Sequence, residues 1–324
     1  MVAQLYRAWR RWPFKVRRVV HRATSWTGLP YVVSFAAGYA ATQSGANFAG
    51  NLPDLKVAYR RSSGRDRERL AGRINDLANA LVLPNGVRRT TYPARTKGTL
   101  SAILADERCR LDRQKIRVLD IPSANGIACL GSFEVLNGHY PVECYVMGDL
   151  LTRTLYDRDR GCIYDEAHNL LQVRQGKRFF SVYRAHRSGE PFGRVARTLL
   201  FPVELVSRRL KRRFPFSRHA NITPILMVHP EVEARLGDGV FELRTMNVFA
   251  PIDGEFDVIL SFNLLQRNYF PPDVIARGTE NLGRSLAEGG LLILGSPDEG
   301  GTNPYRVLRK CGGMLTVVKE QGRF

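Results

Sequence analysis

The chain has 324 residues, of which 44% are hydrophobic, so it is long enough for one large domain or two and apolar enough for a packed core. Its net charge of +19 favours an anionic partner such as nucleic acid, a phospholipid surface or an acidic protein, although charge of this size also serves solubility alone. The five cysteines form no C-x-x-C pair. This spacing disfavours a disulfide framework or a zinc site and favours a reduced, cytoplasmic protein.

A basic, aromatic stretch opens the chain. No acidic residue precedes Asp54, and Trp9, Trp12 and Trp26 lie among the cations Arg7, Arg10, Arg11, Lys15, Arg17, Arg18 and Arg22. Arginines beside tryptophans suit a membrane–water interface, which predicts contact with an anionic membrane surface and a peripheral location. A transit peptide has a similar composition, and a helical arm packed on the rest of the protein is equally compatible.

The remainder of the first third is predicted to be helical. Leu70, Ile74, Leu77 and Leu81 share one helical face, and Pro84-Asn85-Gly86 ends that helix. We therefore expect a basic helical amino-terminal region over residues 1–110. A core over 111–324 follows, with an insertion at about 151–220.

Residues 115–131, KIRVLDIPSANGIACLG, predict a strand, a turn and a helix. Residues 116–121 form a short apolar run typical of a buried strand, the turn covers 122–126, and a helix begins at Ile127. A turn of small residues before a helix amino-terminus is the usual cradle for a nucleotide-like ligand. The stretch resembles motif I of the class I S-adenosylmethionine-dependent methyltransferases. Pro122 and Ala124 stand at the first two glycine positions of that motif, and Gly126 matches the third.

A second strand over 142–147 ends at Gly148-Asp149. A carboxylate at this point offers paired acceptors for two ribose hydroxyls. The interval from Gly126 to Asp149 is 149 − 126 = 23 residues, about what a helix and a short loop require. The competing interpretation is a solvent-exposed turn aspartate.

The predicted insertion is a β-hairpin and helix subdomain. Strands are expected within 157–184, with a turn at Gln175-Gly176, and a basic amphipathic helix over 192–216 kinks at Pro202. This segment is where we expect acceptor specificity to lie. Its basic helix is compatible with an acidic substrate, a membrane surface or a solvated helix face.

The chain then returns to the core with strands at 241–246 and 256–261, a helix from Pro271-Pro272 to 288–290, and a strand at 291–294. The segments FDVILSFNLLQRNYF and LAEGGLLILG resemble motifs IV to VI of class I methyltransferases. Among these enzymes they are most similar to the chemotaxis-receptor glutamate methyltransferases. Asn263 matches the asparagine of that pattern and Tyr269-Phe270 its aromatic pair, whereas Phe262 replaces the expected arginine.

The resemblance implies a doubly wound α/β fold with a mostly parallel seven-stranded sheet and an antiparallel carboxyl-terminal strand. The terminal hairpin expected at 305–318 favours S-adenosylmethionine over a dinucleotide. The implied cofactor-binding residues are Asp120, Pro122, Ser123, Asn125, Gly126, Asp149, Asn247, Val248, Asn263 and Leu264. Tyr269 would shape the acceptor pocket, and Asp298 is a candidate general base.

We therefore expect S-adenosylmethionine-dependent methyl transfer to a small-molecule or protein carboxylate, hydroxyl or amine. The alternative is a catalytically inactive methyltransferase-like module that binds a membrane surface or a protein. No metal is expected, because the six histidines show no paired-ligand spacing. Nucleic acid is not the favoured partner, because no RNA-binding motif accompanies the basic charge.

Overall fold

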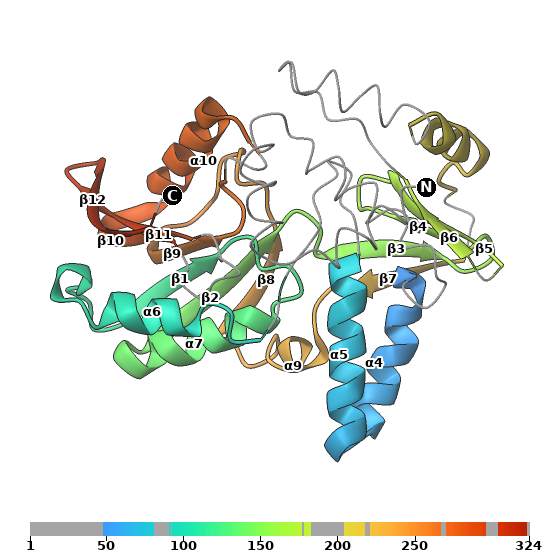
Figure 1. The fold of residues 1–324 in the computed structure, drawn as a ribbon, viewed down its shortest axis with the longest axis horizontal. Helices are drawn as coiled ribbons and strands as arrows, with labels where there is room; N and C mark the ends of the chain where they lie inside the picture. The colour runs from blue at the N-terminus through green and yellow to red at the C-terminus, as the bar shows by residue number, and fades with distance from the viewer. Residues whose placement is uncertain are drawn as a thin grey trace, which may run out of the picture. The chain divides into compact units, whose positions relative to one another are not determined.

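The computed structural model describes residues 48–80, 91, 93–176, 178–182, 204–217, 221–266, 270–295 and 304–322 (Figure 1). The chain divides into two compact units, one formed by 1–89 with 153–226 and the other by 90–152 with 227–324. The basic stretch before Phe48 lies outside the described residues. Within those residues, no helix has the length and apolar character needed to cross a bilayer.

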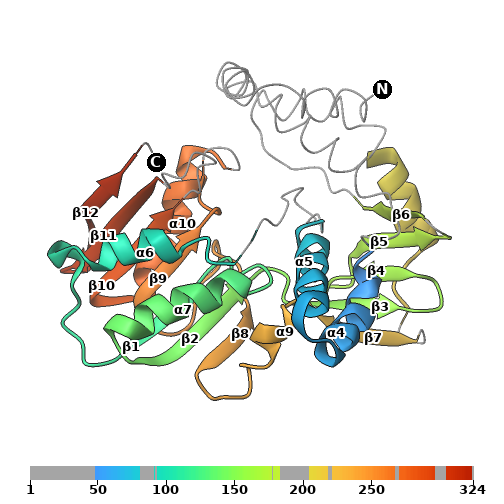
Figure 2. The ribbon, with the colours of Figure 1, turned by 60° about the horizontal axis from the view of Figure 1, so that its bottom comes forward.

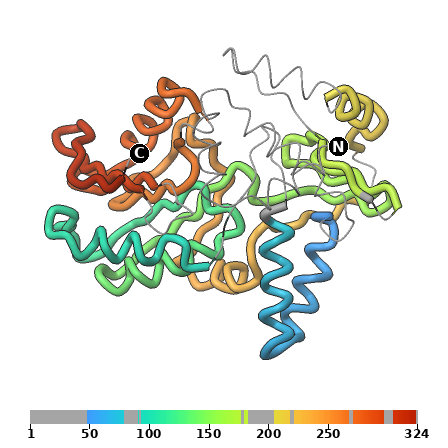
Figure 3. The backbone as a smooth tube through the Cα atoms, viewed as in Figure 1, coloured from blue at the N-terminus to red at the C-terminus, as the bar shows by residue number. Residues whose placement is uncertain are grey.

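The second unit contains a seven-stranded sheet in the order β12-β11-β10-β9-β1-β2-β8. The strands are β1 (Ile116–Asp120), β2 (Val142–Asp149), β8 (Phe241–Thr245), β9 (Phe256–Phe262), β10 (Leu286–Gly295), β11 (Tyr305–Cys311) and β12 (Met314–Gln321). Neighbours from β8 to β10 pair in parallel, whereas β10, β11 and β12 form an antiparallel meander, visible as the red end of the tube in Figure 3. This arrangement confirms the predicted fold class.

Helices cover both faces of this sheet. They are α6 (Lys97–Leu104), α7 (Ile127–His139), the one-turn α9 (Pro230–Glu233) and α10 (Pro272–Arg284), with a 3-10 turn η3 (Glu107–Cys109). Figure 2 shows α6 and α7 together on one face. Side chains alternate along a strand, so Leu119 and Ile121 of the β1 region enter the apolar core that α10 also contributes to. Asp120 points to the α7 face, where the ring of Tyr145 packs against Phe133.

The first unit contains a five-stranded antiparallel sheet in the order β6-β5-β4-β3-β7. Its elements are η2 (Ala49–Asn51), α4 (Leu52–Arg61), α5 (Gly64–Ala80), β3 (Arg153–Asp157), β4 (Cys162–Tyr164), β5 (Leu170–Gln175), β6 (Arg178–Ser181) and β7 (Ile222–Leu226). Gly176, with φ of 60°, lies in the predicted turn between β5 and β6. Of the predicted basic helix, residues 204–213 are helical, and Leu210 packs on the sheet. Residues 192–203 lie outside the described part.

The boundary between α10 and β10 differs from the prediction. The apolar spacing through Leu286 favours a helix that continues to 288–290, but α10 ends at Arg284 and β10 begins at Leu286. Leu286 pairs with Phe256, and the register shifts before Leu291. Gly289 adopts φ of 78° in this irregular stretch. Gly289 and Gly290 therefore lie in a bulge inside β10 rather than at the end of a helix.

Candidate cofactor site

Four loops meet where the parallel strands β1, β2, β8 and β9 end, because parallel strands place their carboxyl ends at one edge of a sheet. Backbone hydrogen bonds hold the first of these loops against its neighbours. The Ser123 N–H donates to the Gly148 carbonyl at 2.8 Å, and the Ile121 N–H donates to the Leu260 carbonyl at 2.9 Å. The turn after β1 is thereby fixed between the ends of β2 and β9.

The acidic side chain of Asp149 contacts this turn directly. Its Oδ2 accepts a hydrogen bond from the Ala124 N–H at 2.8 Å, and its Oδ1 accepts from the Leu151 N–H at 3.0 Å. The side chain is only 3% exposed. Asp149 is thus not an exposed turn residue, and the acid that ends β2 lies beside the turn after β1.

The backbone of this turn adopts conformations that favour glycine. Ala124 has φ of 53° and Gly126 has φ of 77°, both in the left-handed region. A Cβ on Gly126 would come within 2.8 Å of Val232 Cγ1, so the position also requires a residue without a side chain. Ala124, which stands at a glycine position of the motif, is therefore held in a conformation that alanine rarely adopts.

Asn125 stabilises the turn from inside. Its Oδ1 accepts a hydrogen bond from the Ile127 N–H at 3.2 Å, and its carbonyl accepts from the His229 N–H at 2.8 Å. His229 in turn caps α9, because its Nδ1 accepts from the Glu231 N–H. With 1% exposure, Asn125 closes the turn before α7 through its own side chain and joins this turn to α9.

Two buried hydroxyl groups at this edge make no hydrogen bond within the described residues, namely Ser123 Oγ and Ser261 Oγ. Ser123 lies in the turn after β1, and Ser261 is the penultimate residue of β9, the neighbouring strand. Buried polar groups normally have partners. A turn with an unpartnered hydroxyl, left-handed residues and an adjacent carboxylate fits a polar ligand such as the methionyl and ribose parts of S-adenosylmethionine.

Asp120 belongs to a buried polar cluster under α7. Its Oδ2 accepts from the Tyr145 hydroxyl at 2.8 Å, and the Cys129 thiol hydrogen-bonds the same carboxyl. Burial raises the pKa of Asp120, and burial likewise raises the pKa of Tyr145 and of Cys129. These contacts place the Asp120 carboxyl under α7, whereas the Asp149 carboxylate borders the turn itself.

The other predicted cofactor residues follow β8 and β9. Asn247 is exposed, and its Oδ1 accepts from the Phe249 N–H at 3.0 Å, whereas Val248 is buried in the core. Asn263 has φ of 65°, and its Oδ1 accepts from Gln266 Nε2 at 2.9 Å. Pro122 and Leu264 are half-buried. All of these residues lie on loops at the carboxyl edge.

Two apolar side chains at this edge are not singled out by the motifs. Leu150 directly follows Asp149 and is 46% exposed, and Phe249 follows β8 and is 39% exposed. The Phe249 ring makes an edge contact with Phe270 at 5.1 Å between centroids. The sequence could have indicated them by position, since each is a large apolar residue within four residues of the end of a strand that ends in a polar residue.

Tyr269 and Asp298, the predicted acceptor-pocket residue and general base, lie outside the described residues. Among the residues that are described, no group of three or more His, Cys, Asp or Glu side chains is arranged to hold a metal ion.

No protein-family model and no curated protein sequence matches this chain. Solved structures similar to it include the rRNA methyltransferase aviRa from Streptomyces viridochromogenes, with 13% identity, a TM-score of 0.32 and coverage of 67% of this chain and 78% of that one. The N-methyltransferase NodS from Bradyrhizobium japonicum, solved with S-adenosylhomocysteine, has 12% identity, a TM-score of 0.24 and coverage of 62% and 72%.

A third similar structure is a candidate protein-L-isoaspartate O-methyltransferase from Plasmodium falciparum in complex with S-adenosylhomocysteine. It has 12% identity, a TM-score of 0.30 and coverage of 75% of both chains. None of the three is a chemotaxis-receptor glutamate methyltransferase, so that narrower resemblance stays a prediction. Likenesses this low carry no argument about function, which has to be inferred from the carboxyl-edge site of this chain itself.

Proposed function

We propose that this protein is an S-adenosylmethionine-dependent methyltransferase whose cofactor lies across the carboxyl edge of the seven-stranded sheet. The observation that carries the proposal is the hydrogen bond between Asp149 and the Ala124 N–H. It fixes an acid at the end of β2 beside a left-handed turn that leads into a helix. The ribose of a nucleoside needs two hydrogen-bond acceptors, which the Asp149 carboxylate offers. The methionyl part of the cofactor needs a backbone that it can approach closely, which the turn at Ala124 offers.

The Asp149 carboxylate is the ribose contact that we propose. Its Oδ2 accepts from the Ala124 N–H and its Oδ1 from the Leu151 N–H, and each oxygen of a carboxylate can accept two hydrogen bonds. We assign the ribose hydroxyls to this carboxylate. The backbone bonds hold the carboxylate in place before the ligand arrives, which reduces the ordering cost of binding.

The remaining assignments follow the order of the loops. Adenine would lie by Asn247 and Val248, with the exposed side chains of Leu150 and Phe249 as apolar contacts for its ring. The methionyl part would lie between the turn after β1, where Ser123 offers its hydroxyl, and Asn263 with Leu264 after β9. These are the loops that the backbone hydrogen bonds hold together.

Bound S-adenosylmethionine supplies an electrophilic methyl group on a sulfonium. The task of the protein is to orient the acceptor in line with that methyl group and to keep water away. A general base is required only for an acceptor that must lose a proton, and Asp298 and Tyr269 remain candidates for base and acceptor contact. The acceptor we propose is a small molecule or protein that bears a carboxylate, hydroxyl or amine.

The second candidate is a catalytically inactive binding module. The observation that favours it is the engagement of Asp149 by two backbone N–H groups, together with Pro122, which has no N–H to offer a ligand. Such a module would keep the fold and bind no cofactor, so the two candidates differ in a single measurable property.

Titration with S-adenosylhomocysteine in a calorimeter tests the proposal. Micromolar binding by the full chain is expected, and Asp149→Ala is expected to weaken it by at least about tenfold, because hydrogen bonds to a charged group are lost. Asp112→Ala, which changes an exposed acid before β1, is the matched control and should bind like the wild type. Absence of binding by a folded wild-type chain would overturn the proposal and favour the module.

A further inference from the structure

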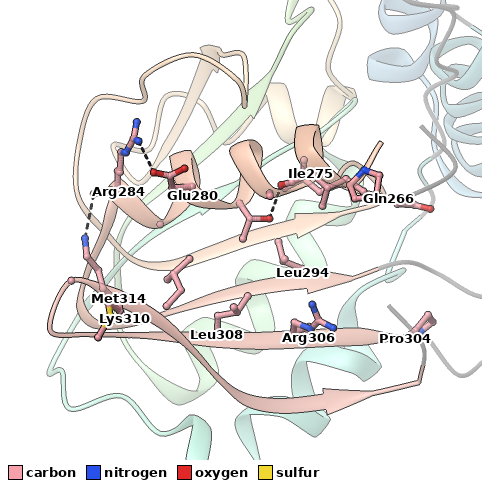
Figure 4. Close-up of a pocket in the computed structure, with 17 residues that line it drawn as sticks. Gln266, Ile275, Glu280, Arg284, Leu294, Pro304, Arg306, Leu308, Lys310 and Met314 are labelled. Carbon is pink, nitrogen blue, oxygen red and sulfur yellow. Dashed lines mark hydrogen bonds and ion pairs between the residues drawn. The ribbon is translucent and has the colours of Figure 1, made fainter. Parts of the chain in front are cut away.

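A groove separate from Asp149 runs beneath α10 in the second unit. Its volume is about 1130 Å³, its wall is α10, and its floor is formed by β10, β11 and β12 (Figure 4). The side chains that face it are largely apolar and include Ile275, Leu294, Leu308 and Leu315. One end reaches Gln266, whose amide also contacts Asn263, so the groove begins near the carboxyl edge and leads away from it.

The connection of the strands explains why this face is open. A parallel crossover would have to carry a helix across the sheet, whereas the meander from β10 to β12 turns back twice, the second time at Gly312-Gly313. The opposite face is covered: Lys319 donates to the Ala102 carbonyl, and Arg309 donates to the Arg108 carbonyl. Among the described helices, α10 is the one that packs on the groove side of these strands.

The dimensions suit a helix. The groove is lined from Pro272 to Arg284, the full length of α10, and 13 residues of α-helix span about 20 Å. A second helix of about three turns could lie beside α10 on the floor formed by Leu294 and Leu308, as helices do on the faces of α/β sheets. Met314, 72% exposed at the tip of the terminal hairpin, adds an apolar contact at the far end.

The charged residues of the groove select the chemistry of that helix. The lining residues include three cations, Arg284, Arg306 and Lys310, and one acid, Glu280. Arg306 pairs with Glu320 of β12 at 2.7 Å. Glu280 pairs with Arg284 at 2.7 Å. Lys310 Nζ donates to the Leu286 carbonyl at 2.6 Å, and no carboxylate pairs with it in the described part of the chain. An acidic partner complements this rim.

We propose that the groove binds an acidic amphipathic helix of a partner protein. Its apolar face would lie on Leu294, Leu308 and Leu315, and its carboxylates would meet Lys310. The amino-terminal stretch of this chain is a poorer fit, because it carries cations and no acid before Asp54. The groove is a site distinct from the cofactor site, so the two can be tested independently.

The probe is a fluorescent 14-residue helical peptide with leucine at positions i, i+3, i+4 and i+7 and glutamate on its other face. Fluorescence polarisation with the full chain should show saturable binding that weakens with salt. Ala276→Trp, which fills the groove from α10, and Lys310→Glu should each weaken binding by at least about tenfold. Arg277→Trp and Arg277→Glu alter a neighbouring exposed residue outside the groove and should leave binding unchanged.

A charge-reversed peptide, with lysine in place of glutamate, completes the experiment. It should bind the wild type more weakly and bind Lys310→Glu more tightly than the glutamate peptide does. Equal affinity for both peptides, or equal losses at Ala276 and Arg277, would overturn the proposal. So would a Lys15–Lys310 cross-link in the isolated full chain, which would identify its own amino-terminal stretch as the occupant. Displacement of the peptide by phosphatidylserine vesicles would overturn it in favour of a membrane surface.

Discussion

The side chain of Asp149 and the main chain of Ala124 are joined by a hydrogen bond of 2.8 Å, although the two residues lie on different loops. The bond makes the turn after β1 and the end of β2 one structural unit. A change in either residue should therefore affect both cofactor affinity and local stability, and the two effects can be separated by the choice of substitution.

Asp149→Asn keeps the shape of the side chain but presents an NH₂ group toward one of the two backbone N–H donors. We expect S-adenosylhomocysteine to bind at least about tenfold more weakly, and the free energy of unfolding to fall by about 1–3 kcal/mol. Calorimetric titration and urea denaturation measure the two quantities. An unchanged affinity would show that the ribose lies elsewhere.

Ala124→Gly should be tolerated or stabilising. Alanine at φ of 53° is strained by about 1–2 kcal/mol, and the extra freedom of glycine in the unfolded chain offsets about 0.4–1 kcal/mol of the relief. The net rise in unfolding free energy is therefore between about 0 and about 1.6 kcal/mol. Ala128→Gly inside α7, where no strain is relieved, should instead lower it by about 1 kcal/mol. A loss of the same size at both positions would contradict the left-handed geometry of Ala124.

Gly126→Ala should destabilise the protein by about 1–3 kcal/mol, because the new Cβ approaches Val232 and the backbone has positive φ. Gly138→Ala is the matched control in the same helix. A Cβ there meets nothing within 4 Å, so the substitution should add about 0.5–1 kcal/mol. Urea denaturation of both variants gives the comparison. The double variant Gly126→Ala with Val232→Ala should recover part of the loss, the remainder being backbone strain.

Asp120→Asn should change how stability depends on pH. Burial raises the pKa of Asp120 above its ordinary value of 3.8, so between these two pKa values the folded chain binds a proton that the unfolded chain releases. Stability from this carboxyl is therefore complete below pH 3.8 and is lost as pH rises through the raised pKa. Thermal unfolding followed across this range should show a decline for the wild type that is absent in Asp120→Asn.

The neighbours of Asp120 do not reverse this sign. Burial raises the pKa of both Tyr145 and Cys129, which keeps these groups neutral, and Arg95 lowers the pKa of Asp120 only as the smallest of its causes. Asparagine retains an oxygen that accepts from Tyr145. If Asp120→Asn proves less stable than the wild type at every pH, the carboxylate is ionised and stabilising, and the direction assigned here is wrong.

Local pattern was sufficient for much of the fold. The apolar run 116–121, the small-residue turn and the helix at Ile127 each have a short-range cause, and all three form where they were predicted. The end of α10 depends on a long-range cause, the pairing of Leu286 with Phe256. The sequence analysis does not predict strands β3 and β7. These two strands pair with each other across a large sequence separation, so no short-range pattern marks them.

The candidate site shows the same division. The proximity of Asp149 to the turn follows from strand order alone, and the sequence predicts it. The direction of the Asp120 side chain follows from which sheet face α7 covers, and the hydrogen bond of Asn125 to the Ile127 N–H follows from the geometry of the folded turn. The motif resemblance predicts all three as cofactor contacts, and it carries no information on the direction of their side chains.

The two ends of the segment 153–226 lie side by side. Its first and last residues, Arg153 and Leu226, are paired strand partners, and the Met227 N–H donates to the Thr152 carbonyl at 2.8 Å just outside the segment. Removing the segment would leave two chain ends that a few residues could rejoin. Residues 1–89 belong to the same compact unit as this segment, so a chain shortened to 90–152 joined to 227–324 would lose that unit whole and keep all seven strands of the other sheet.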